Sequence, residues 1–176
     1  MEILSDAKNW TWVLHRPCGE CGLDTRAIAP ERVAGLIRAN AHQWVELLHG
    51  EADLRNRSTP TRWSPLEYAC HVRDVFRLYD HRLRLMLTED DPLYPNWDQD
   101  ATAVAQRYAE QDPETVAGEL QEAGEALAAR FEQVDDRWDR TGRRSDGATF
   151  TVGTFARYLI HDPIHHVYDV TGRRHS

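Results

Sequence analysis

Residues 64–87 read SPLEYACHVRDVFRLYDHRLRLML and carry the strongest helix signal in the chain. The stretch opens with Ser64 at a suitable N-cap position, Pro65 at the first helical position and Glu67 three residues after the serine, which together form a capping box. Apolar side chains then recur at helical spacing; they are Leu66, Val72, Val75, Phe76, Tyr79, Leu83 and Met86. The stretch therefore predicts a long helix that buries one face.

Three further stretches show the same helical period. Residues 30–48 begin with a proline in the first turn and present one apolar face. Asp112, followed by a proline, marks the start of a third long helix, and a last helix starts near Thr151. Four long helices with one apolar stripe each predict an all-α four-helix bundle.

The connections between these helices are irregular. Prolines and acidic residues break the pattern over 89–100, and a short helix is expected over 101–110. Residues 140–147, RTGRRSDG, indicate a polar turn, and only 148–152 has the composition of a strand. A connection as long as 89–100 is compatible with a crossover, so the expected fold is a four-helix bundle with a crossover connection.

Length and charge limit the class of protein. A chain of 176 residues suits one domain, and we expect an N-terminal extension over 1–27 followed by one helical bundle domain over 28–176. The net charge of −8 disfavours nucleic-acid partners, because an acidic surface repels phosphates. The chain shows no signal peptide, and no apolar run approaches the ~20 residues of a membrane span. With three cysteines, an odd number, these features predict a cytoplasmic protein without a membrane partner.

Two histidines near the C-terminus suggest a metal site. In HDPIHHVYDV at 161–170, His161 and His165 are four residues apart, which on a continuous helix places their Cβ atoms about 5–6 Å apart on one face. His71 projects close to Val75, toward the bundle interior, and is the expected third ligand. For one histidine alone, a core residue bonded to a carbonyl or carboxylate is the better explanation. Three together predict a metal site with a position left for water or substrate.

Pro163 lies between these two histidines and leaves two interpretations open. A proline lacks the backbone N–H, so it can bend a continuous helix. Alternatively, Asp162 caps a new helix with the proline in its first turn, which would separate the two histidines. We favour the continuous helix because one apolar row runs across the proline; it consists of Phe155, Leu159, Pro163 and Val167.

Three nearby residues are candidates to support the ligands. Asp74 follows His71 by three residues and Asp169 follows His165 by four, so either carboxylate can orient an imidazole. Both are equally well explained as solvated charges on a helix surface. His166 points about 100° away from its neighbour on a helix, and we interpret it as a surface or supporting residue.

Cys18 and Cys21, in RPCGECG at 16–22, form a CxxC pair followed by glycine. The pair is similar to one knuckle of a zinc ribbon, but no second CxxC is present. Three interpretations remain open: a redox pair, part of a secondary metal site, or a tight turn with two thiols. The third cysteine, Cys70, precedes His71, and we expect a small buried side chain there.

Two motifs in one order carry a family resemblance: WSPLEYACHVRDV at 63–75 and LIHDPIHHVYDV at 159–170. The chain resembles the DinB family of bacterial proteins, most closely the branch common in actinobacteria, from about residue 28 to 170. The resemblance implies a four-helix bundle, often a homodimer, in which His71, His161 and His165 hold a divalent metal such as nickel, zinc or iron.

The resemblance also implies a chemistry. Better understood relatives are bacillithiol or mycothiol S-transferases and the mycothiol-dependent maleylpyruvate isomerase, which use a low-molecular-weight thiol. By this similarity the metal would bind the thiolate and aim it at a small electrophile. A metal-dependent thiol S-transferase is therefore expected, with a non-catalytic stress protein that binds metal or small ligands as the alternative. The resemblance assigns no role to Cys18 and Cys21.

Overall fold

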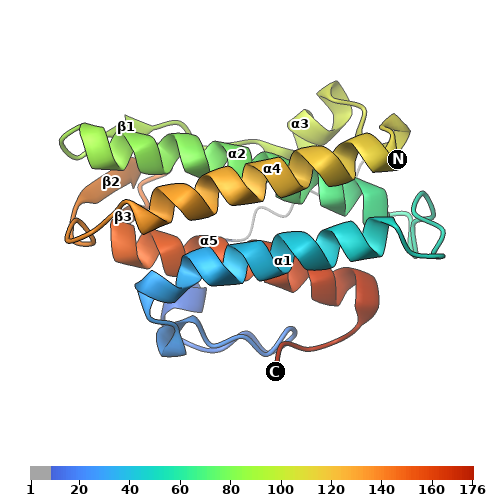
Figure 1. Cartoon of the computed structure of the whole chain (residues 1–176), viewed down its shortest axis with the longest axis horizontal. Helices are drawn as coiled ribbons and strands as arrows, with labels where there is room; N and C mark the ends of the chain where they lie inside the picture. The colour runs from blue at the N-terminus through green and yellow to red at the C-terminus, as the bar shows by residue number, and fades with distance from the viewer. Residues whose placement is uncertain (1–8) are drawn as a thin grey trace.

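Four long helices form the expected bundle in the computed structural model, which describes residues 9–176 (Figure 1). They are α1 (Val33–Leu48), α2 (Pro65–Thr88), α4 (Pro113–Glu132) and α5 (Val152–Thr171). Helix α4 packs against both α1 and α2, and α5 contacts the same two helices. The prediction of an all-α four-helix bundle is confirmed.

The helices begin where the sequence signals place them. At the start of α2, the Glu67 backbone N–H donates to Ser64 Oγ at 3.3 Å and the Ser64 N–H donates to the Glu67 carboxylate at 2.8 Å. This reciprocal pair is the predicted capping box. The carboxylate of Asp112 caps α4, and Thr151 caps α5. These starts are local, because each satisfies free N–H groups of its own first turn.

Helix α5 runs without interruption through Pro163. The continuous helix, which was the favoured interpretation, is therefore confirmed. A side chain of α1 also bonds the backbone at this point: Asn40 donates its Nδ2–H to the Pro163 carbonyl at 3.1 Å. The four-residue spacings on either side of the proline are consequently true helical neighbours.

A small sheet lies at one end of the bundle, and the sequence predicts only its last strand, the one expected over 148–152. Strand β1 (Leu93–Tyr94) pairs in parallel with β2 (Thr141–Arg144), which pairs antiparallel with β3 (Thr149–Thr151). The polar turn expected over 140–147 is thus a strand for half its length. The alternation is hidden because the buried positions of β2 are Gly142 and Arg144. A Cβ at Gly142 would lie 2.7 Å from Met86 Cγ, so the strand needs glycine for its close approach to α2.

Short helices occupy the connections. Helix α3 (Gln99–Ala105) and the 3₁₀ helix η4 (Tyr108–Glu110) divide the expected helix over 101–110. The N-terminal segment contains the 3₁₀ helices η1 (Trp10–Leu14), η2 (Thr25–Ala27) and η3 (Pro30–Arg32). All three contact α5, and Figure 1 shows this blue segment beneath α1 and α5. The extension is therefore packed on the bundle.

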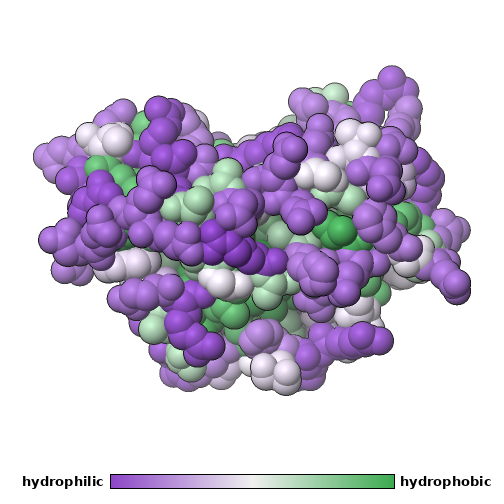
Figure 2. Space-filling view, in the orientation of Figure 1, coloured by the Kyte–Doolittle hydropathy of each residue, from purple (hydrophilic) through white to green (hydrophobic). Residues whose placement is uncertain are grey.

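Apolar side chains fill the centre of the bundle, and hydrophilic residues cover much of the face in Figure 2. Trp44, Phe76 and Leu127 are fully buried between the helices. A Cβ at Gly124 would lie 2.9 Å from Ala41 Cβ, so α1 and α4 approach closely at this point. Across residues 9–176, no helix has both the length and the apolar character that crossing a membrane requires.

Candidate metal centre

His161 and His165 lie next to each other on α5, as their spacing predicts. Their ring centroids are 5.1 Å apart, and the residues are only 3% and 5% exposed. The Nε2 atom of His161 is buried and has no hydrogen-bond partner among residues 9–176. Burial, together with the charge of His165, lowers the pKa of His161 to about 4. The ring is therefore neutral near pH 7, which is the form that binds metals.

The CxxC segment folds back onto this histidine pair. The Gly22 N–H donates to the Cys18 carbonyl at 3.0 Å, and the Cys18 N–H donates to the Leu23 carbonyl at 2.9 Å. Gly22 has a φ of +84°, which explains the glycine after the second cysteine. The turn places Cys18 Sγ 3.6 Å from Nδ1 of His165, and both cysteines are buried free thiols.

Cys18, Cys21, His161 and His165 form what we call the cysteine–histidine cluster. Each offers one ligand atom, and these atoms all lie within 4.8 Å of one another. Burial raises the pKa of Cys21 to about 12, so that thiol keeps its proton unless a cation replaces it. Two thiols and two imidazoles are a ligand set typical of zinc. The sequence has no second CxxC, and His161 and His165 of α5 take the place of the missing pair of ligands.

His71 lies in a second group. Its Nε2 is 3.1 Å from Asp162 Oδ2, and Asp162 Oδ1 is 3.4 Å from Nε2 of His166. One ligand atom from each of these three residues lies within 4.8 Å of the others, and we call them the His71 cluster. Nδ1 of His71 is buried without a hydrogen-bond partner among the residues described. The ring of His71 stacks on Trp97 at 5.4 Å.

Charge distinguishes this group from the first. Burial alone would lower the pKa of His166, but Asp162 and Asp169 outweigh it and raise that pKa to about 9. Burial would raise the pKa of Asp162, yet His166 and His71 hold it well below its usual value. In the metal-free protein His166 is therefore a cation bound by two carboxylates.

One cavity joins the two clusters. Its volume is about 760 Å³, and five of its lining residues come from the clusters: His71, His161, Asp162, His165 and His166. The other lining residues include aromatic and cationic side chains, among them Tyr79, Arg82, Trp97, Arg144 and Tyr158. Neither Cys18 nor Cys21 lines the cavity. The thiols thus lie behind the histidines, and the His71 cluster is open.

The structure divides the predicted ligand triad. His71, His161 and His165 line one cavity, but His71 groups with Asp162 and His166 and not with the other two. Sequence reasoning missed Asp162 and His166 as candidate ligands. A signal for them was present, since they are four residues apart, just like His161 and His165.

The two expected supporting carboxylates take different positions. Asp74 accepts hydrogen bonds from Arg73 at 2.9 Å and from the hydroxyl of Tyr108, and the carboxylate beside His71 is Asp162. Asp169 lies 3.7 Å from Nε2 of His165 and 2.9 Å from Nδ1 of His166. Asp169 therefore stands between the two clusters.

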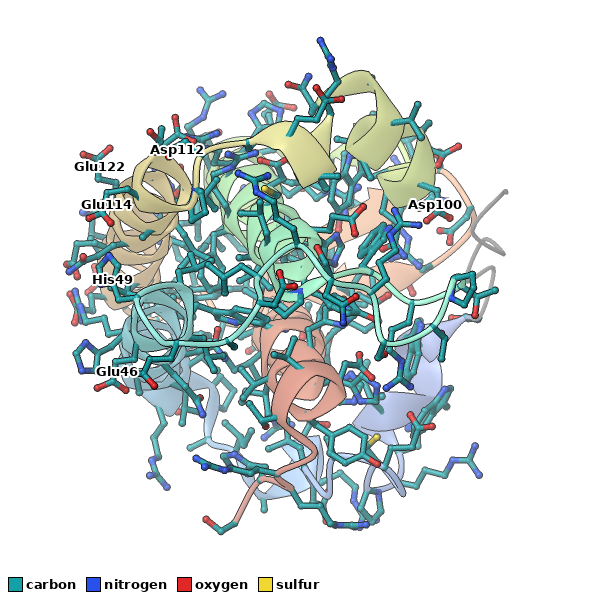
Figure 3. All side chains as sticks on the ribbon, turned by 90° about the vertical axis from the view of Figure 1, so that its right-hand side faces the viewer. Glu46, His49, Asp100, Asp112, Glu114 and Glu122 are labelled. Atoms are coloured by element: carbon teal, nitrogen blue, oxygen red, sulfur yellow. The ribbon has the colours of Figure 1, made fainter. Side chains whose placement is uncertain are left out.

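The opposite side of the bundle offers a contrast. His49, the residue that follows α1, lies 3.2 Å from Glu114 of α4, and both side chains are at the surface (Figure 3). Asp100, which lines the cavity, appears on the other side of the same view. His49 is therefore a histidine with a carboxylate partner outside the candidate centre, which makes it a matched control position.

Comparisons with known proteins agree with this fold. A family model described as the DinB superfamily matches residues 36–170, and no curated protein matches the chain. A solved structure of YfiT from Bacillus subtilis, described as a probable metal-dependent hydrolase with an unusual four-helix bundle topology, is similar with a TM-score of 0.67. It is 20% identical and covers 88% of this chain and 90% of YfiT. Because the family model spans most of the bundle, the chain belongs to the DinB superfamily.

Proposed function

We propose that the chain is a metal-dependent enzyme that acts on a small molecule in the cavity. The observation that carries this proposal is the opening of the His71 cluster onto a space of about 760 Å³, a volume within the ~300–1,000 Å³ of small-molecule sites. Buried nitrogens without partners are uncommon because they lose their hydration. The Nδ1 atom of His71 is such a nitrogen among the described residues, while its Nε2 faces Asp162. The donor set of the cluster, two imidazoles and one carboxylate with ligand atoms within 4.8 Å of one another, fits a cation.

Within this proposal the His71 cluster is the reaction site. Two imidazoles and one carboxylate leave coordination positions for a substrate. A divalent ion bound there would lower the pKa of water or of a thiol and so supply a nucleophile near neutral pH.

The chain's own side chains orient these ligands. The His71 ring lies between two indoles, with ring centroids 5.2 Å from Trp63 and 5.4 Å from Trp97. Asp169, which is not one of the three ligands, lies 2.9 Å from Nδ1 of His166, and the Nε2 of that ring is the nitrogen near Asp162. Carboxylates in this position fix the tautomer and the direction of a ligand histidine. The cluster is thus held in place by the protein.

The finer proposal is thiol transfer, and the family resemblance supports it. In such a reaction the sulfur of a low-molecular-weight thiol forms a bond to an electrophilic carbon. The leaving group departs with its electron pair, and the thiol proton passes to a base or to the leaving group. Hydrolysis is the second candidate, because YfiT, which has a similar fold, is described as a probable metal-dependent hydrolase.

An activity assay with matched variants tests this function. Untagged protein is loaded separately with zinc, nickel or iron, and is then given mycothiol or bacillithiol with a panel of electrophiles. A parallel panel of esters and amides without thiol tests hydrolysis. We expect turnover that requires metal, is lost in His71→Gln and is kept in His49→Gln.

Three outcomes separate the alternatives. Thiol adducts that require metal support the transferase, and thiol-independent cleavage supports the hydrolase. Metal binding without turnover on either panel would instead support the non-catalytic binding protein. Full turnover in His71→Gln would overturn the assignment of the reaction site to the His71 cluster.

A further inference from the structure

We propose that Cys18, Cys21, His161 and His165 together bind one zinc-class divalent ion in a closed site, separate from the reaction site. The four residues come from opposite ends of the chain and are at most 5% exposed. Their ligand atoms lie within 4.8 Å of one another. This inference goes beyond the proposed function, which requires no metal here.

The donor atoms match this class of ion. Two sulfurs and two imidazole nitrogens are soft and borderline ligands, which select zinc over magnesium or calcium. The buried Nε2 of His161 has no hydrogen-bond partner among residues 9–176. A buried polar atom without a partner costs free energy, and a bound cation removes that cost.

His165 shows the orientation expected of a ligand. Its Nδ1 lies 3.6 Å from Cys18 Sγ, inside the cluster. Its Nε2 faces outward, 3.3 Å from the Glu20 carboxylate and 3.7 Å from the Asp169 carboxylate. Metal-binding histidines commonly donate their second N–H to a carboxylate, which fixes the tautomer and strengthens the ligand.

The turn around the cysteines is also suited to thiolates. The segment from Cys18 to Leu23 closes on itself through two backbone hydrogen bonds, with Gly22 in the left-handed region. Burial raises the pKa of the Cys21 thiol, and the backbone N–H of Leu23 acts against that rise. Oriented N–H groups around a sulfur stabilise negative charge when a metal replaces the thiol proton.

The surroundings make this site closed. The ring of Trp10 lies over both histidines, at 5.4 Å from His161 and 5.3 Å from His165. On the other side the His175 N–H donates to the Cys21 carbonyl at 2.7 Å, so the C-terminal tail covers the turn. Four protein ligands leave no position for a substrate. The role that follows is structural: the ion fastens the N-terminal segment, which supplies Trp10 to the cavity wall.

Metal analysis and cobalt spectroscopy test the site without any assay of activity. Untagged protein should contain zinc, and cobalt reconstitution should give thiolate-to-cobalt charge-transfer absorption in the near ultraviolet. We expect Cys18→Ser and Cys21→Ser to lose this absorption and one equivalent of metal. Cys70→Ser is the matched control, because Cys70 is also buried but lies outside the cluster. It should keep both.

Alkylation of the wild-type protein tests the same site without a substitution, so the result does not depend on whether a variant folds. With metal bound, Cys18 and Cys21 should resist a thiol reagent, and a chelator should expose both to it while Cys70 stays unchanged. Cobalt absorption without a thiolate band, or unchanged metal content in Cys21→Ser, would overturn the proposal. The His71→Gln variant should keep the thiolate band, so failure of this site and failure of the reaction site are distinguishable.

Discussion

The cysteine–histidine cluster and the His71 cluster take alternate residues from the same short stretch of α5. His161 and His165 belong to one, and Asp162 and His166 belong to the other. Successive residues on a helix point about 100° apart, whereas residues four apart share a face. The sequence HDPIHH thus contains two interleaved pairs, one directed at the N-terminal segment and one at α2.

The two pairs differ in what the protein places opposite them. Opposite His161 and His165 lie two thiols and the indole of Trp10, so burial dominates and the pKa of His161 falls to about 4. Opposite Asp162 and His166 lies His71 of α2. The carboxylates of Asp162 and Asp169, on α5 itself, outweigh the burial of His166 and raise its pKa to about 9. The neighbourhood, and not the residue type, decides whether a buried histidine is neutral or charged.

Removing a thiol from the cysteine–histidine cluster should have the largest effect on stability. Structural zinc sites contribute about 10–16 kcal/mol of apparent binding free energy in small domains, so we expect Cys21→Ser to lower the free energy of unfolding of the zinc-loaded protein by ~5 kcal/mol or more. Urea unfolding with and without a chelator measures this. Cys70→Ser should respond to the chelator as the wild type does; a normal chelator response in Cys21→Ser contradicts the prediction.

Removing His71 should disrupt the His71 cluster and leave the cysteine–histidine cluster intact. Loss of a ligand or proton-transfer group at a reaction site typically costs about 100-fold or more in rate, and we expect this for kcat in His71→Gln. Cobalt absorption from the thiolates should stay unchanged. His49→Gln should alter neither quantity. If His71→Gln instead loses much of the metal bound at the cysteine–histidine cluster, the two clusters are one site.

Acid should destabilise the metal-free protein through His161. The pKa of this group falls from 6.5 to about 4 on folding, so the unfolded chain binds the extra proton within that window. Stability is therefore lost as the pH falls from 6.5 to about 4, by up to ~3 kcal/mol from this group. His161→Gln should flatten this limb in urea unfolding of chelated protein, whereas the exposed His42→Gln should leave it as steep as in the wild type.

Alkali should also lower the stability of the metal-free protein, in this case through His166, whose pKa shifts in the opposite direction. The pKa of His166 rises from 6.5 to about 9 on folding, so its contribution is complete below 6.5 and is lost as the pH rises through 9. The contribution is at most ~3 kcal/mol. Chelated His166→Gln should lose less stability than the wild type over this range. Equal slopes would show that the carboxylates do not hold the charge of His166.

The smallest effect is expected at Asp169, which stands between the clusters. Replacing a carboxylate that orients a ligand histidine typically costs about 10–100-fold in metal affinity. We expect Asp169→Asn to weaken metal binding at the His71 cluster about 10-fold, with a smaller change at the cysteine–histidine cluster. The distances predict this order, because Asp169 is 2.9 Å from His166 and 3.7 Å from His165. Competition titrations with a chelating dye measure both.

The helices could be predicted because their signals are local. Ser64 and Glu67 satisfy the first turn of their own helix, and the apolar rows need only a core to face. Strand β2 could not be predicted, because Arg144 is buried through contacts with Asp146 and Tyr158. Such a burial depends on partners that no alternation pattern reveals.

The candidate site was predictable only in part. The spacing of His161 and His165 shows that they share a face, but not what lies opposite. The contact between Cys18 and His165 joins residues 147 positions apart, and no local rule indicates it. The sequence indicates a surface or supporting residue at His166, because it points away from the predicted ligands, whereas α2 brings His71 to that very side.

Four of the six tryptophans stand beside the candidate ligands. Trp10 and Trp12 lie 5.4 and 6.3 Å from the ring of His161, and Trp63 and Trp97 lie 5.2 and 5.4 Å from that of His71. A paramagnetic ion quenches indole fluorescence at such short range. The protein thus contains its own optical reporter, and replacing one pair of indoles with phenylalanine would let emission follow the filling of each cluster separately.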